Sequence, residues 1–151
     1  MLGFYSVRKL LEAGKVSPLI DTRNISLIEY QRGLHRSQPV YGPILQAHYN
    51  LDLPHQLQAS LRFVCNQVVH SYVFAIAVGY KSGFAGIYFA SERERNDRMF
   101  FLKARELITL FCDVARDRHS DGNRWVEERL STHRVQTAFP PRSRVPMPGH
   151  P

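Results

Sequence analysis

The sequence has little cysteine and no long uninterrupted apolar run. Its two cysteines, Cys65 and Cys112, provide neither a disulfide framework nor the ligand spacing of a zinc site. The densest apolar stretch, residues 72–90, is broken by Lys81, Ser82 and three glycines. It therefore falls short of the roughly 20 residues that a membrane-spanning helix needs. The first residues contain no apolar region as long as a signal peptide requires. These absences predict a cytoplasmic protein without a membrane partner.

The composition is that of a globular protein with an excess of positive charge. Among 151 residues, 44% are hydrophobic, and 20 Lys and Arg against 13 Asp and Glu give a formal net charge of +7. This charge permits a polyanionic partner such as RNA without demonstrating one. Residues 134–151 contain no acidic residue and five prolines. We therefore expect a single domain over residues 1–133 and a disordered tail over residues 134–151.

In the first half of the chain, the spacing of apolar residues predicts helices. We expect one helix at residues 4–14, one or two turns of helix at residues 25–32, another such piece at residues 44–49, and a long helix at residues 52–72. The long helix is predicted from one apolar stripe with helical spacing, formed by Leu57, Leu61, Val64, Val68 and Tyr72.

The second half changes to β-branched, aromatic and small residues, which favour strands. A glycine-containing connection at residues 79–83 predicts a hairpin over residues 72–90. The other expected elements are a third strand at residues 99–102, in a run that could instead start a helix, and helices at residues 103–118 and 124–131. The expected fold class is therefore α+β, with a helical core and a small antiparallel sheet.

Arg62, Asn66 and His70 are spaced four residues apart and therefore lie on one side of the predicted long helix. The run Asn66-Gln67-Val68-Val69-His70-Ser71-Tyr72 resembles the N-x-x-x-H-S half of the motif helix of the HEPN superfamily. At the position where that family has arginine, this chain has Cys65. The resemblance implies a metal-independent ribonuclease without a cofactor, commonly a dimer in which two motif helices face each other.

The residue types fit that chemistry in part. His70 can exchange a proton with a 2′-hydroxyl near neutral pH, and Asn66 can orient a substrate by hydrogen bonding. Arg62 is the only nearby cation, because a cysteine cannot stabilise a developing phosphorane charge. We therefore expect a HEPN-like protein that binds RNA or a protein partner, with a possible homodimer through the motif helix. The alternatives are a weak ribonuclease that uses His70, Arg62 and Asn66, and an interaction module unrelated to nucleic acid.

A second candidate for RNA binding is the acid-free stretch from Tyr30 to Leu51. It interleaves cations with aromatic rings that can stack on bases, namely Arg32, Arg36, Tyr41 and Tyr49. A surface loop built around prolines explains the same pattern. The histidines lack metal-ligand spacing, so no metal or other cofactor is expected. The arginines of the mixed-charge stretch at residues 91–98 are interpreted as solvated.

Overall fold

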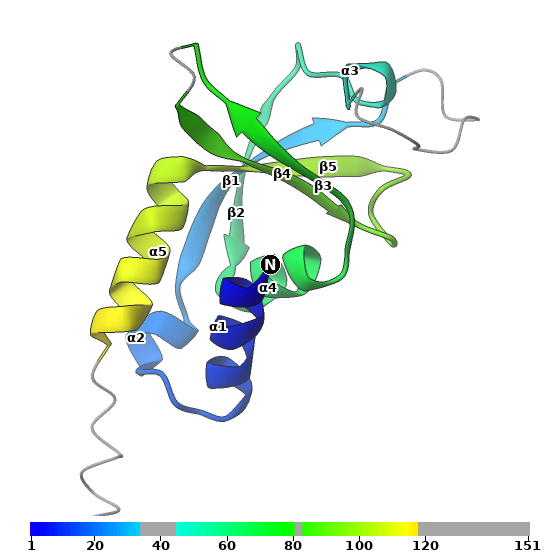
Figure 1. Cartoon of the computed structure of the whole chain (residues 1–151). Helices are drawn as coiled ribbons and strands as arrows, with labels where there is room; N and C mark the ends of the chain where they lie inside the picture. The colour runs from blue at the N-terminus through cyan, green and yellow to red at the C-terminus, as the bar shows by residue number, and fades with distance from the viewer. Residues whose placement is uncertain (34–44, 81–82, 118–151) are drawn as a thin grey trace, which may run out of the picture. The chain divides into compact units, whose positions relative to one another are not determined.

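The computed structural model describes residues 1–33, 45–80 and 83–117. Within them, five strands form one antiparallel sheet in the order β2-β1-β5-β4-β3 (Figure 1). The strands are β1 (Asn24–Gln31), β2 (His55–Ser60), β3 (Ser71–Val78), β4 (Phe84–Ser91) and β5 (Arg98–Lys103). The helices of the same residues are α1 (Leu2–Glu12), α2 (Pro18–Asp21), α3 (Leu45–His48), α4 (Leu61–Val69) and α5 (Ala104–Arg116).

The two faces of the sheet are covered differently. On one face, α4 and α5 pack on the sheet and α1 packs against α4, and the buried residues of this layer form the main core (Figure 1). Phe89, Phe100 and Leu102 of this core are fully buried. On the other face, Leu45, Tyr49 and Leu51 pack against Tyr30 and Met99 in a smaller cluster. The sheet, rather than a helical bundle, is therefore the centre of the fold.

The prediction of a helical core with a small hairpin is wrong, and two local predictions account for most of the error. Residues 25–31 lie in β1 instead of in helical turns, and residues 55–60 of the predicted long helix form β2. The helix itself begins only at Leu61, because the Ser60 side chain accepts a hydrogen bond from the Phe63 backbone N–H (3.2 Å) and caps it there. A strand and a short helix thus replace one long helix.

Several other elements agree with the sequence. The predicted strands of the hairpin are present as β3 and β4, and the predicted third strand is present as β5. The helices expected at residues 4–14 and 103–118 correspond to α1 and α5. The helix expected at residues 124–131, the domain boundary near residue 133 and the proposed tail lie outside the described residues and stay predictions.

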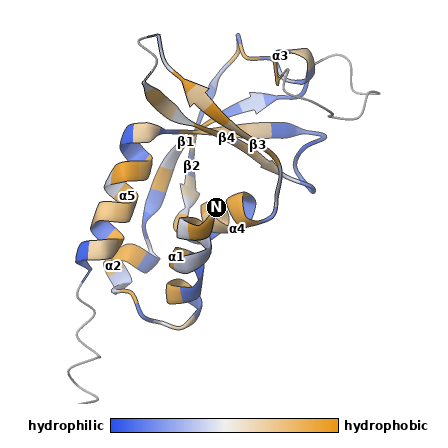
Figure 2. Cartoon of the chain, in the orientation of Figure 1, coloured by the Kyte–Doolittle hydropathy of each residue, from blue (hydrophilic) through white to orange (hydrophobic). Residues whose placement is uncertain are grey.

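The two edge strands differ in the side chains that they expose. β2 exposes His55, Gln56 and Gln58, which are polar. β3 instead exposes Phe74, Ile76 and Val78, and most of the strand carries hydrophobic colours in Figure 2. In the described part of the chain, each of these strands has one neighbour in the sheet, β1 for β2 and β4 for β3. No helix in the same residues is both long and apolar enough to cross a bilayer.

Candidate functional site

An open cleft of about 650 Å³ lies where α4 ends and β3 begins. The end of β4 forms its other wall, because Ser71 of β3 pairs with Ser91 of β4 in the sheet. The side chain of Gln67 fixes this wall by accepting a hydrogen bond from the Ser91 backbone N–H (3.3 Å). The cleft is lined by Asn66, Gln67, Val69, His70, Ser71, Tyr72, Ser91, Glu92 and Arg93.

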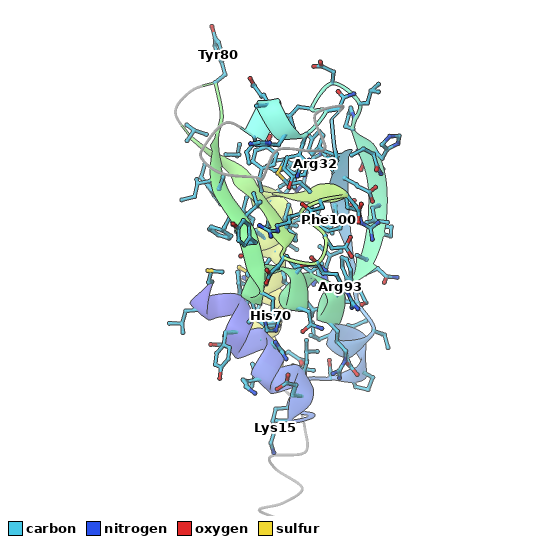
Figure 3. The ribbon with its side chains drawn as sticks, turned by 90° about the vertical axis from the view of Figure 1, so that its right-hand side faces the viewer. Lys15, Arg32, His70, Tyr80, Arg93 and Phe100 are labelled. Carbon is cyan, nitrogen blue, oxygen red and sulfur yellow. The ribbon has the colours of Figure 1, made fainter. Side chains whose placement is uncertain are left out.

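His70 is the first residue after α4, and its imidazole contacts an arginine of another helix. The His70 backbone N–H donates to the Asn66 carbonyl (3.0 Å), which ends the helix in a regular turn. Arg8 Nη1 of α1 lies 2.8 Å from His70 Nε2, and Arg8 Nε donates to Glu12 (2.7 Å). In Figure 3, His70 lies beside the ribbon of α1 and far from Tyr80 at the opposite end of the hairpin. The cation next to His70 is therefore Arg8, which the sequence interpretation missed.

The three polar residues predicted to act together are only partly brought together. Asn66 and His70 both line the cleft, as their four-residue spacing predicts. Arg62 does not line it. Its guanidinium instead pairs with Asp21 of α2 (2.7 Å) and donates to the Leu11 carbonyl at the end of α1 (3.1 Å). Arg62 thus joins α4 to α1 and α2, where it is engaged in holding helices together.

The far wall of the cleft carries a cation and an aromatic ring. Arg93 is exposed, and it makes no hydrogen bond or ion pair with the residues that the structure describes. Glu92, the acidic residue of the lining, lies 3.9 Å from Arg95 and has a largely exposed side chain. The Arg95 guanidinium lies over the Tyr72 ring, 3.8 Å from its centroid. Of the arginines interpreted as solvated, Arg93 lines the cleft and Arg95 covers its Tyr72, whereas Arg98 pairs with Glu29 and Glu94.

Two of the four predicted RNA-binding residues hold the turn that carries Arg93. Arg32 and Tyr49 are 6% and 2% exposed, so neither offers its side chain to a nucleic acid. Both donate to the Arg95 carbonyl, Arg32 Nη1 at 3.1 Å and the Tyr49 hydroxyl at 2.8 Å. Arg36 and Tyr41 lie outside the described residues. In the part of the stretch that is described, the aromatic and cationic side chains therefore position the 92–97 turn.

Cys65, which stands where the resembled family has arginine, faces the core. It is fully buried, and burial raises the pKa of its thiol to about 12. The thiol is therefore protonated at neutral pH and packs as a small apolar group. It supplies neither a nucleophile nor a charge to the cleft.

The cleft brings together polar side chains from the end of α4, the start of β3 and the turn after β4. Hydrogen-bonding groups of Asn66, His70, Ser71 and Arg93 converge on one cleft. The Arg–His pair needed for acid–base cleavage of RNA is not assembled from Arg62, because that side chain is engaged elsewhere. Among the residues described, no three His, Cys, Asp or Glu side chains are grouped as metal ligands.

Comparison with known proteins finds no match: no family model, no curated protein and no solved structure is similar to this chain.

Proposed function

We propose that this chain is a protein-interaction domain that associates with a second copy of itself through the edge strand β3. The observation that carries the proposal is the uncharged, apolar character of this edge. Phe74, Ile76, Val78 and the neighbouring Phe84 of β4, here called the β3 strip, are 40%, 65%, 68% and 47% exposed. Val78 and Phe84 are opposite each other in the sheet, so the strip is continuous.

An edge strand presents unpaired backbone N–H and C=O groups, which another strand can pair with. Soluble proteins normally protect such an edge with charged residues or proline. Residues 71–80 contain neither. The register of β3 with β4 is regular from Val73 to Ala77, so the middle of the strand is straight enough to pair on its free side. Among the residues that the structure describes, β3 is therefore open to pairing, whereas β2 exposes polar side chains.

A second copy fits this edge because the strip is self-complementary. In an antiparallel pair of two β3 strands with Ile76 at the two-fold axis, each Phe74 is opposite Val78 of the other copy. All these contacts are apolar, and no like charges are opposed.

The strip exposes on the order of 400 Å² of side-chain surface per copy, at about 200 Å² for a whole aromatic side chain. Edge-to-edge pairing leaves the outward faces of these side chains in solvent, so two copies bury less than the roughly 1,000 Å² at which specific interfaces begin. This size favours a weak, concentration-dependent dimer.

Ribonuclease activity has less support than binding. The placement of Arg62 leaves His70 without the predicted catalytic cation, and Arg8, which contacts His70 instead, does not line the cleft. The resemblance of residues 61–72 to the HEPN motif helix stays a prediction, as do RNA binding near Arg36 and Tyr41 and a cytoplasmic location.

The test is the mass of the full chain in solution as a function of concentration, measured by sedimentation or light scattering. We expect the mass of the wild type to rise from one copy toward two. Ile76→Lys places a charge in the middle of the strip, at an exposed position where the fold tolerates it, and should keep the chain monomeric. Gln58→Lys makes the same change in charge on the polar edge β2 and should behave like the wild type.

Three outcomes would overturn the proposal. The wild type could stay monomeric at the highest soluble concentration, or Ile76→Lys could dimerise as strongly as the wild type. Thirdly, a chain ending at residue 117 could dimerise while the full chain does not. This result would indicate that residues 118–151 bind the β3 strip in the full chain and block dimerisation. Circular dichroism melts of both lysine variants establish that each one is folded.

A further inference from the structure

The cleft beside His70 contains four polar groups that engage none of the residues at 1–33, 45–80 and 83–117. The Ser71 hydroxyl is buried without a hydrogen-bond partner there. The Asn66 amide, the second ring nitrogen of His70 and the Arg93 guanidinium also have no partner in this part of the chain. The Ser71 hydroxyl is the buried one of the four, whereas the Asn66, His70 and Arg93 side chains are exposed, so water hydrates them until a ligand replaces it. Their convergence on one cleft therefore indicates a polar ligand.

The contact with Arg8 fixes the hydrogen-bonding character of His70. A guanidinium can only donate, so His70 Nε2, 2.8 Å from Arg8 Nη1, accepts. A neutral imidazole with Nε2 as acceptor carries its proton on Nδ1, which makes Nδ1–H a donor. Arg8 is not part of the cleft lining, so Nδ1 is the ring nitrogen left for a ligand.

These four groups are thus mainly donors, and the strongest of them is cationic. Arg93 offers a planar fork of N–H groups, His70 offers Nδ1–H, and Asn66 and Ser71 add an amide and a hydroxyl donor. The acidic residue of the lining, Glu92, has a largely exposed side chain and lies 3.9 Å from Arg95. Several donors around one guanidinium match the oxygens of a tetrahedral anion, and a phosphate group is the common one with this geometry.

Tyr72 indicates that the ligand carries more than phosphate alone. Its ring lines the same cleft, and Arg95 covers one side of the ring at 3.8 Å. Tyr72 is nevertheless 43% exposed, so part of the ring is available to an organic group. The cleft volume of about 650 Å³ also falls in the range of small-molecule sites, well above what a single phosphate ion occupies.

We propose that this cleft binds a phosphate monoester, with Arg93, His70, Asn66 and Ser71 on the phosphate and Tyr72 against the attached organic group. The site is built by one copy of the chain, so it does not rest on the proposed dimer.

The test uses the full chain with three probes, namely inorganic phosphate, phenyl phosphate and a nucleoside monophosphate. Binding is followed by calorimetry and by the amide resonances of residues 66–71. We expect saturable binding of both monoesters, with shifts at Asn66, His70 and Ser71, and weaker binding of inorganic phosphate. The two monoesters distinguish a site for any aromatic ester from one that prefers a nucleotide.

Two matched arginine variants separate a specific site from general attraction to a basic protein. Arg93→Ala should weaken monoester binding about ten-fold or more, because it removes a charged hydrogen-bonding group. Arg105→Ala, at an exposed position of α5 outside the cleft, changes the net charge equally and should change affinity less than about two-fold. Ile76→Lys should bind like the wild type, so failure of dimerisation leaves this test intact.

The proposal is overturned if no probe shifts the resonances of residues 66–71. Equal weakening by Arg93→Ala and Arg105→Ala would also overturn it, since only the overall charge would then matter. If inorganic phosphate bound as tightly as both monoesters, the assignment of Tyr72 to the organic group would be wrong.

Discussion

Arg8 Nη1 and His70 Nε2 are 2.8 Å apart, although 62 positions separate the two residues in the chain. The contact joins α1 to the turn between α4 and β3, and it ties the first helix to the wall of the cleft. No local pattern specifies such a pair, because it depends on the packing of α1 against α4.

This contact predicts the tautomer of His70. Since Arg8 donates to Nε2, we expect the proton on Nδ1, which long-range proton–nitrogen NMR spectra of the imidazole report directly. Arg8→Ala should remove this preference and lower the free energy of unfolding by about 1 kcal/mol. Lys9→Ala removes the neighbouring cation, which pairs with Glu12, and should leave the tautomer unchanged. A wild-type spectrum with the proton on Nε2 would contradict the assignment.

Gly86 is predicted to be essential for the centre of the sheet. Its φ is 153°, and a Cβ added there would lie 2.3 Å from the Leu102 carbonyl oxygen of β5. That atom belongs to the backbone and cannot move aside cheaply. Gly86→Ala should therefore lower the free energy of unfolding by at least about 2 kcal/mol in urea denaturation. Gly83→Ala, where an added Cβ meets open space, should change it by less than about 0.5 kcal/mol. Equal effects of the two substitutions would show that the close approach of β4 and β5 is not the cause.

Burial of Cys65 predicts a loss of stability at alkaline pH. The pKa of its thiol is raised from 9.0 to about 12 in the folded chain, so the folded state holds this proton more tightly than the unfolded state. The resulting stabilisation is complete below pH 9 and is lost as the pH rises toward 12. Burial also raises the pKa of Tyr30 and Tyr49, which adds to the same trend. A comparison of wild type with Cys65→Ala isolates the thiol.

The measurement is urea denaturation between pH 7 and the alkaline limit of solubility. The free energy of unfolding of the wild type should fall more steeply above pH 9 than that of Cys65→Ala. At pH 8 a thiol reagent should label the half-buried Cys112 in the native chain and leave Cys65 unlabelled. Parallel pH profiles for the two proteins, or rapid labelling of Cys65, would show that this side chain is accessible to solvent.

The second half of the fold was predictable because local sequence patterns indicate its strands and its helix. The hairpin of β3 and β4 has glycines at its turn and β-branched or aromatic residues on both sides, and α5 shows a clear helical stripe. In the first half, where α1 was predicted, β1 was mistaken for helical turns because it is buried on both faces. Ile25 and Leu27 contact one core cluster while Tyr30 belongs to the other, so the strand shows no simple alternation of apolar and polar residues.

The error at β2 and α4 has a different cause. Leu57 lies four residues before Leu61 and extends the helical stripe of α4 backward by coincidence. Two local signals pointed the other way: Gln56 and Gln58 alternate with Leu57 and Ala59, and Ser60 is a good helix N-cap. For the site, helical spacing placed Asn66 and His70 together correctly. The predicted hairpin could also have placed Arg93 nearby, because its register sets Ser91 opposite Ser71.

The contrast between the two edges of the sheet limits how far copies can add to one another. If both edge strands were apolar, each chain that joined would leave its other apolar edge free to pair with a further chain. The assembly would then grow into fibrils. Here β2 ends the sheet with glutamines and a histidine, while β3 alone offers an apolar border. Two-fold pairing covers the β3 edge of both copies, so the proposed assembly stops at two chains and does not polymerise.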